Sequence, residues 1–218
     1  FTGSKIYERE LLLAYFDFLP AAFLPTDARS GFVDYHSLFF THDPDALTQM
    51  GWALRFYDLS LRYAPAQAKG KIEREHQFWQ GRLPAYFASE KITEMAIATA
   101  NHNLRTQHNT HELHRELRQT PQRAWNQARK ENRSLLRPAP RCSWWDYVWS
   151  VCTLIKIGPA GRVPIGTQRL RLERSPGTKV VLCLHPEGHH SVLAAPPDPQ
   201  QKPVLLFTDD PVETVLLC

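Results

Sequence analysis

Turn-forming residues divide the last third of the chain at short intervals, and this spacing constrains the fold more than any other feature. Glycine and proline cluster at 158–161, 175–177 and 186–188. The apolar and β-branched residues between them favour five strands, at 147–157, 168–173, 178–184, 191–194 and 204–208. Five short strands at this spacing predict a small β-barrel. A Pro-Ala-Pro linker at 138–140 precedes this part of the chain.

The chain before that linker alternates helical and strand-like segments, which predicts an α/β fold. Strands are expected at 31–34 and 59–63, and helices at 6–19, 43–56, 71–87, 89–104 and from Pro121 onward. Pro20 should end the first helix, because proline lacks the N–H that continues the hydrogen-bond ladder. Ser89 is expected to cap the N-terminus of one helix, and Pro121 to occupy the first position of another.

The charge of the chain is unevenly distributed. All 218 residues carry a net charge of only +4, and 43% of them are hydrophobic, which is enough for a globular core. Between Arg105 and Arg141, however, eight Arg and one Lys stand against three Glu, a local excess of six positive charges (8 + 1 − 3). Such a segment either binds a polyanion or forms a solvated helix face, and both interpretations stay open.

The sequence also indicates where the chain resides and how its cysteines behave. No apolar run approaches the roughly 18 to 20 residues needed to span a bilayer, and we expect a cytoplasmic protein without membrane contact. The cysteines show no C-x-x-C spacing, so they are expected to be reduced packing residues. The chain begins with Phe1, and we expect it to be a fragment of a longer protein.

The segment from Tyr63 to Arg74 places one carboxylate, Glu73, among several cations at an expected loop-to-helix junction. A second acid, Asp34, ends an expected buried strand 39 positions earlier (73 − 34). An acid at a strand end facing an acid on a packed helix could hold Mg²⁺ or Mn²⁺ and leave positions for phosphate oxygens. Alternatively, Asp34 caps a turn and Glu73 complements the helix dipole.

Two stretches of the sequence resemble the integrase core of DDE transposases, the family of bacterial insertion-sequence transposases and retroviral integrases. The first stretch is 32–40, which contains Asp34, and the second and more specific one is 65–74, which contains Glu73. Helical patterns at 104–109 and 117–125 resemble the segment that follows that core, and the expected barrel is similar to the small C-terminal domain of Mu-type transposases. The resemblance covers most of residues 32–208.

The resemblance implies a partial ribonuclease H-like integrase core at 1–100, a basic helical connector at 101–140 and a DNA-contacting β-barrel at 141–218. In this family three carboxylates bind two divalent metals, Mg²⁺ or Mn²⁺, for DNA strand cleavage and strand transfer in recombination and integration. Asp34 matches the second carboxylate and Glu73 the third, whereas the first has no counterpart in the sequence. The implied partners are double-stranded DNA and, in an intact chain, further copies of itself.

Five cations are candidate contacts to DNA phosphates: Lys69, Lys71, Arg118, Arg162 and Arg169. Alternatively, each of these side chains forms a weak surface ion pair or is simply solvated. A non-catalytic DNA-binding remnant and a protein interaction domain remain alternative functions. Trp144, Trp145 and Trp149 are consistent with either base stacking or core packing, of which packing is the commoner role.

Overall fold

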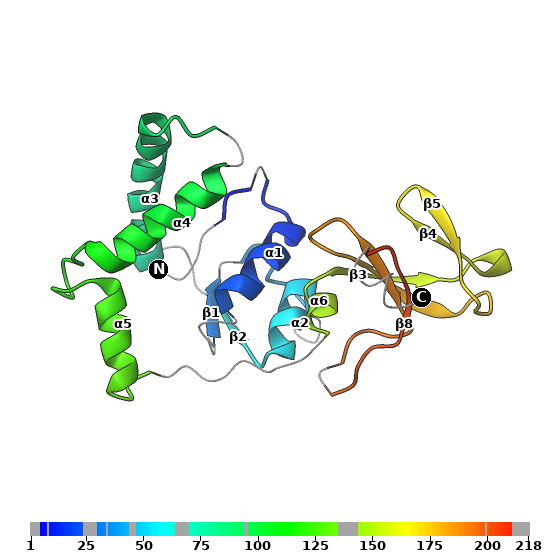
Figure 1. Cartoon of the computed structure of the whole chain (residues 1–218). Helices are drawn as coiled ribbons and strands as arrows, with labels where there is room; N and C mark the ends of the chain where they lie inside the picture. The colour runs from blue at the N-terminus through cyan, green and yellow to red at the C-terminus, as the bar shows by residue number, and fades with distance from the viewer. Residues whose placement is uncertain are drawn as a thin grey trace. The chain divides into compact units, whose positions relative to one another are not determined.

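The protein combines helices with antiparallel sheets, which agrees with the general α/β class predicted from the sequence (Figure 1). The computed structural model describes residues 5–7, 9–23, 30–33, 35–43, 47–63, 70–93, 96–134, 144–198 and 200–210. Its helices are α1 (Leu12–Phe23), α2 (Gln49–Phe56), α3 (Gly70–Ser89), α4 (Ala96–His111), α5 (Pro121–Lys130) and α6 (Trp145–Val148), with a 3-10 turn, η2 (Pro159–Gly161). Its strands are β1 (Ser30–Val33), β2 (Ser60–Tyr63), β3 (Val151–Lys156), β4 (Arg162–Ile165), β5 (Gln168–Arg171), β6 (Lys179–Leu184), β7 (His190–Leu193) and β8 (Leu205–Thr208).

The chain divides into two compact units that interleave along the sequence. Unit 1 comprises residues 1–9, 21–35 and 62–139, and unit 2 comprises residues 10–20, 36–61 and 140–218. The second unit therefore joins two early segments of the chain to its last third. The sequence predicted three consecutive domains and did not predict this joining. Those domain boundaries, 1–100, 101–140 and 141–218, stay a prediction.

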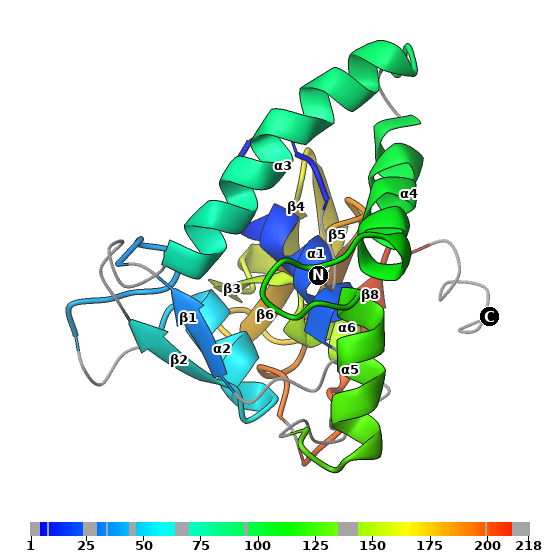
Figure 2. The same cartoon turned by 90° about the vertical axis from the view of Figure 1, so that its left-hand side faces the viewer.

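Helices α3, α4 and α5 build most of the described part of unit 1 (Figure 2). Glu112, just after α4, accepts a hydrogen bond from the Arg82 guanidinium of α3 at 2.7 Å and contacts His108 Nδ1 at 3.0 Å. The Arg82 hydrogen bond is the main cause that lowers the pKa of Glu112 to about 2. The His108 ring also packs against Phe78 and Trp79 of α3. This mixed polar and aromatic contact fixes α4 against the middle of α3.

Unit 2 is built around a four-stranded antiparallel sheet in the order β3-β6-β7-β8. On one face, the sheet and the β4–β5 hairpin enclose a core of Ile157, Val163, Ile165, Leu172, Val180 and Val192. On the other face, Tyr147 of α6 packs with Val181, Cys183 and Leu193. Among the described residues, the sheets are open and no barrel closes. In that same part of the chain, no helix combines the length and hydropathy that crossing a bilayer requires.

Several expected element boundaries are wrong, for local physical reasons. Pro20 is buried inside α1 rather than at its end, and α1 continues to Phe23 although proline lacks the N–H of the hydrogen-bond ladder. Ser89 ends α3 instead of capping the next helix, because its hydroxyl donates to the Tyr86 carbonyl at 2.9 Å. Lys91 then takes a left-handed φ of 51°, which stops the helix. The expected strand at 147–157 begins only at Val151, because α6 occupies the residues before it.

Other expectations are confirmed. The Thr120 hydroxyl accepts a hydrogen bond from the Arg123 N–H at 3.3 Å, and Pro121 opens α5 as its first residue. Strands β5, β6, β7 and β8 lie within two residues of the segments predicted for them. Trp149 is a packing residue, because only 3% of it is exposed and its ring contacts those of Phe16 and Tyr57.

Candidate nucleic-acid interface

The β4–β5 hairpin is formed by a two-residue loop between two short strands. Ile165 and Gln168 pair across the loop, and Gly166 takes its first position with a φ of 55°. A glycine with positive φ at this position is what a two-residue hairpin requires. The pairing fixes a register in which Arg162 faces Arg171 and Pro164 faces Arg169. In Figure 1 the hairpin lies at the end of unit 2 that is away from α2.

Side chains alternate between the two faces of this hairpin. Val163 and Ile165 are buried, with 0% and 7% exposed, and they pack into the core against the four-stranded sheet. The side chains of the opposite face are all exposed. Burying Val163 and Ile165 contributes about 1.5 to 3 kcal/mol each. The hydrophobic face therefore holds the other face outward in a fixed orientation.

That outward face carries three arginines. Arg162 and Arg171 lie directly opposite each other, and Arg169 lies two residues along β5 on the same face. We call Arg162, Arg169 and Arg171 the arginine face. Directly opposite residues in an antiparallel pair have Cβ atoms about 5 Å apart, and diagonal neighbours lie about 7 to 8 Å apart. The register thus gathers three guanidinium groups within reach of one short stretch of polyanion.

Among the residues that the structure describes, no acid pairs with the arginine face. Within the described ranges of the chain, no ion pair involves Arg162, Arg169 or Arg171. Two unit charges about 7 Å apart in water repel by about 0.6 kcal/mol. This cost is small beside the burial of Val163 and Ile165, so the hairpin can fold without a ligand. A bound anion would nevertheless remove the repulsion and add charge-assisted hydrogen bonds.

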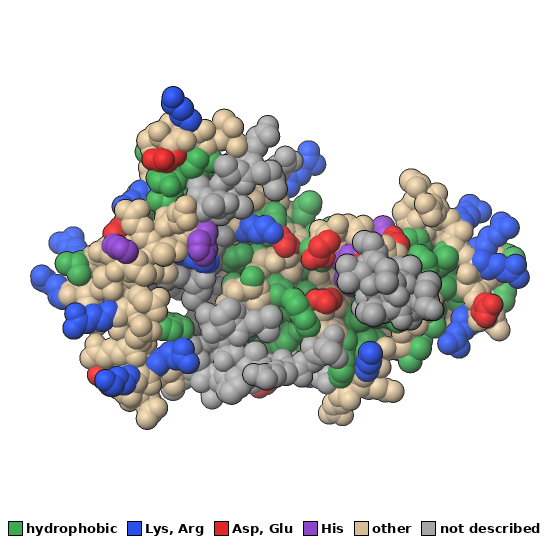
Figure 3. Space-filling model, viewed as in Figure 1, with side chains coloured by type: hydrophobic (Ala, Val, Ile, Leu, Met, Phe, Trp, Pro, Cys, Tyr) green, Lys and Arg blue, Asp and Glu red, His purple; other side chains and the backbone are tan. Residues whose placement is uncertain are grey.

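Unit 2 has a second pair of like charges, on the face of the four-stranded sheet away from the β4–β5 hairpin. Lys156 at the end of β3 lies directly opposite Lys179 at the start of β6, and both are exposed. Between these two lysines the sequence has a single acid, Glu173. Figure 3 shows Lys and Arg side chains gathered over the hairpin end of unit 2. Like charges directly opposite each other destabilise a strand pair, and a bound anion would remove that repulsion.

Unit 1 has a basic surface of its own, on and around α5. Helix α5 has no buried residue, and its exposed cations are Arg123, Arg129 and Lys130. Arg118 lies in the turn before α5, is exposed and has a left-handed φ of 53°. Its backbone N–H donates to the His114 carbonyl at 2.9 Å, which closes the turn. The predicted DNA contact Arg118 thus belongs to an exposed turn of unit 1.

The predicted metal-binding acids are only partly described. Asp34 and Lys69 lie outside the described residues. Lys71 is the second residue of α3, and its side chain is not among the described ones. Glu73 is exposed in the first turn of α3, where a carboxylate complements the helix dipole. Among the described residues, no three His, Cys, Asp or Glu side chains are grouped to hold a metal ion.

The structure shows how the predicted DNA contacts of the last third of the chain come together. Arg162 and Arg169, predicted as DNA contacts, lie with Arg171 on one face of the β4–β5 hairpin because of the observed register. The alternation of arginine with apolar residues at 162–172 was the available signal. It could not reveal β4, because Pro164 lies inside that strand and proline is rare in strands.

The sequence matches no protein-family model and no curated protein.

Proposed function

We propose that this chain binds DNA through its phosphate backbone, as the DNA-contacting part of a DDE-type transposase or integrase. The observation that carries the proposal is the arginine face, three guanidinium groups on one side of a hairpin with no acid in contact among the described residues. Guanidinium forks match phosphate oxygens in shape and charge. Such contacts position DNA without reading its sequence.

The rest of the family proposal rests on the sequence resemblance. It comprises a ribonuclease H-like core at 1–100, a connector at 101–140, a β-barrel at 141–218, and assembly of an intact chain into homo-oligomers on DNA. The helical, basic stretch around α5 is compatible with the connector, and the antiparallel strands of unit 2 are compatible with the β-rich domain. A non-catalytic DNA-binding remnant fits the arginine face equally well, because backbone contact needs no metal site.

Salt-dependent binding to duplex DNA tests the proposal. Fluorescence anisotropy of a labelled duplex of arbitrary sequence gives the association constant at several salt concentrations. Each phosphate contact contributes a slope of about −0.9 to log K against log salt. We therefore expect Arg162→Gln and Arg171→Gln each to make the slope less negative by about 0.9, and the double variant by about 1.8.

The control changes the same charge elsewhere in unit 2. Arg55 is exposed in the last turn of α2 and lies outside the arginine face. Arg55→Gln should leave the slope within about 0.3 of the unsubstituted chain, because no phosphate contact is lost. Equal slopes for all three single variants would contradict a role for the arginine face. Absence of DNA binding even at low salt would instead favour a protein interaction domain.

Strand cleavage stays a separate prediction, which depends on Asp34 and Glu73. The family resemblance predicts that Mn²⁺ or Mg²⁺ supports nicking or joining of transposon-end DNA by a chain with a complete site. Glu73→Gln should then abolish the product while leaving the salt dependence of binding unchanged, because the Glu73 carboxylate forms no ion pair with a DNA phosphate. Product formation that survives this substitution would remove Glu73 from the catalytic site.

A further inference from the structure

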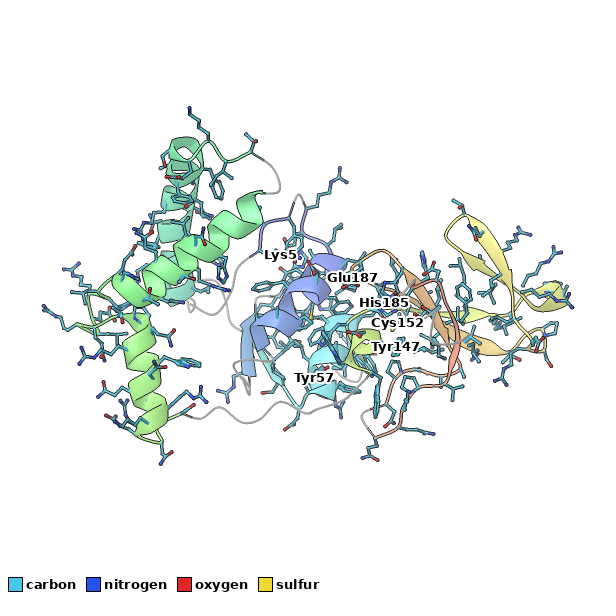
Figure 4. All side chains as sticks on the ribbon, in the orientation of Figure 1. Lys5, Tyr57, Tyr147, Cys152, His185 and Glu187 are labelled. Carbon is cyan, nitrogen blue, oxygen red and sulfur yellow. The ribbon has the colours of Figure 1, made fainter. Side chains whose placement is uncertain are left out.

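Two cysteines lie directly opposite each other in the sheet of unit 2. Cys152 of β3 pairs in register with Cys183 of β6, and their sulfur atoms are 3.8 Å apart. Figure 4 labels Cys152 beside Tyr147 and His185, where α6 meets the sheet. Both thiols are free, Cys183 is fully buried and Cys152 is half-buried. Nothing in the proposed DNA contact uses either of them.

The hydrogen-bond pattern of the ladder shows which kind of pair they form. The Ile157 N–H donates to the Thr178 carbonyl at 2.9 Å, so Ile157 and Thr178 form a hydrogen-bonded pair. Hydrogen-bonded and non-hydrogen-bonded pairs alternate along an antiparallel ladder. Cys152 lies five positions before Ile157 without a register shift, which makes Cys152 and Cys183 a non-hydrogen-bonded pair.

An independent contact agrees with that assignment. The Cys152 N–H points away from β6 and donates to the Gln49 side-chain oxygen of α2 at 2.9 Å. In non-hydrogen-bonded pairs the Cα atoms are about 4.5 Å apart and the side chains approach most closely. A disulfide needs a Cα separation of about 4.4 to 6.8 Å and an S–S bond of about 2.05 Å. Each sulfur therefore has to move by only about 1 Å, with the strands in place.

The two thiols differ in their acidity. A hydrogen bond from the Cys183 thiol is the main cause that lowers the pKa of Cys152 to about 7, and Ser150 acts in the same direction against the effect of burial. The same contact and burial raise the pKa of Cys183. The half-buried cysteine is thus the better nucleophile, and its buried neighbour keeps its proton until it reacts.

We propose that Cys152 and Cys183 form a reversible disulfide when the protein meets a hydroperoxide. The Cys152 thiolate attacks one peroxide oxygen, the O–O bond breaks, and the departing oxygen takes a proton to leave as water. Cys152 is then a sulfenic acid. The Cys183 sulfur attacks the Cys152 sulfur, the S–O bond breaks, and the second oxygen leaves as water with the Cys183 proton. Two thiols and one hydrogen peroxide give one disulfide and two waters.

The bond would close a loop that contains the whole arginine face. Residues 153–182 lie between the two cysteines and include β4 and β5. A closed loop of this length raises the melting temperature of a chain of this size by about 5 to 10 °C, provided that the bond forms without strain. Oxidation would therefore stabilise the part of unit 2 that presents the arginines, whether or not this surface binds DNA.

Mass spectrometry of the oxidised full chain tests the proposal. Cys142 and Cys218 lie outside the described residues, so both are first replaced by serine to leave a single pair. The reduced protein is treated with a small excess of hydrogen peroxide, its remaining thiols are alkylated, and it is digested without reductant. We expect a linked peptide pair that joins Cys152 to Cys183, a melting temperature raised by about 5 to 10 °C, and reversal of both by dithiothreitol.

Single serine variants distinguish the cysteine that attacks the peroxide from the cysteine that then attacks the sulfenic acid. In Cys183→Ser the sulfenic acid on Cys152 should persist and be trapped by dimedone, because no partner thiol condenses with it. In Cys152→Ser no dimedone adduct should form on Cys183. Thiols that stay unmodified in excess peroxide would overturn the proposal. So would overoxidation of Cys152 without a linked peptide, or an adduct on Cys183 in place of Cys152.

Discussion

Trp149→Ala should lower the free energy of unfolding by about 4 kcal/mol, the largest loss we expect from any single substitution in unit 2. Trp149 follows α6, is 3% exposed and stacks on Tyr57 with ring centroids 5.5 Å apart. Phe16 of α1 meets the same indole edge-on at 5.8 Å. Alanine would leave a cavity between three segments that are distant in sequence. Urea unfolding followed by far-ultraviolet circular dichroism measures the loss.

Trp149→Phe is the matched control. The Trp149 ring N–H is buried and has no hydrogen-bond partner among the described residues. Phenylalanine keeps one aromatic ring for Tyr57 and Phe16 and removes this unsatisfied donor, which itself costs about 1 to 3 kcal/mol. The two effects nearly cancel, so Trp149→Phe should change stability by less than about 1 kcal/mol. Equal losses in both variants would show that a phenyl ring cannot replace the packing of the indole against Tyr57 and Phe16.

The packing of Phe16, Tyr57 and Trp149 also shows what the sequence alone could not predict. The spacing of turns and apolar residues predicted β5 to β8, because these short antiparallel strands are determined by local patterns. Nothing local indicates that Phe16 and Tyr57 pack on Trp149, which lies more than 90 residues further along. The interleaved units follow from such long-range contacts, and consecutive domain boundaries were the natural expectation without them.

For the candidate site, too, the sequence predicted the residues but not the strand pairing that brings them together. Arginines at 162, 169 and 171 are visible as alternation in the sequence, but their common face depends on a strand that contains Pro164. The cysteine pair depends on the register of β3 against β6, which no spacing rule reports. The absence of C-x-x-C spacing predicts only reduced packing residues, and both thiols are free in the structure. Asp34 remains a prediction from the sequence alone, because it lies outside the described residues.

Gly161→Ala should cost about 3 kcal/mol of stability and disrupt the hairpin that presents the arginine face. Gly161 ends η2 immediately before β4 and has a φ of 73°. A Cβ there would lie 2.5 Å from the Leu172 carbonyl oxygen, a backbone atom that cannot swing away. The Leu172 N–H also donates to the Gly161 carbonyl at 2.8 Å. The clash would therefore push Gly161 and Leu172 apart and break this hydrogen bond beside β4 and β5.

Gly177→Ala isolates the conformational part of this effect. Gly177 has a similar φ of 83°, but a Cβ there would meet no atom within 4 Å. Its substitution should cost only about 1 kcal/mol, the strain of a left-handed alanine. The difference of about 2 kcal/mol between the two variants then measures the contact with Leu172. Because that contact sets the spacing of β4 and β5, Gly161→Ala alone should also weaken DNA binding at a temperature where both variants remain folded. Equal stability of the two variants would mean that the hairpin accommodates the added methyl group by moving its backbone.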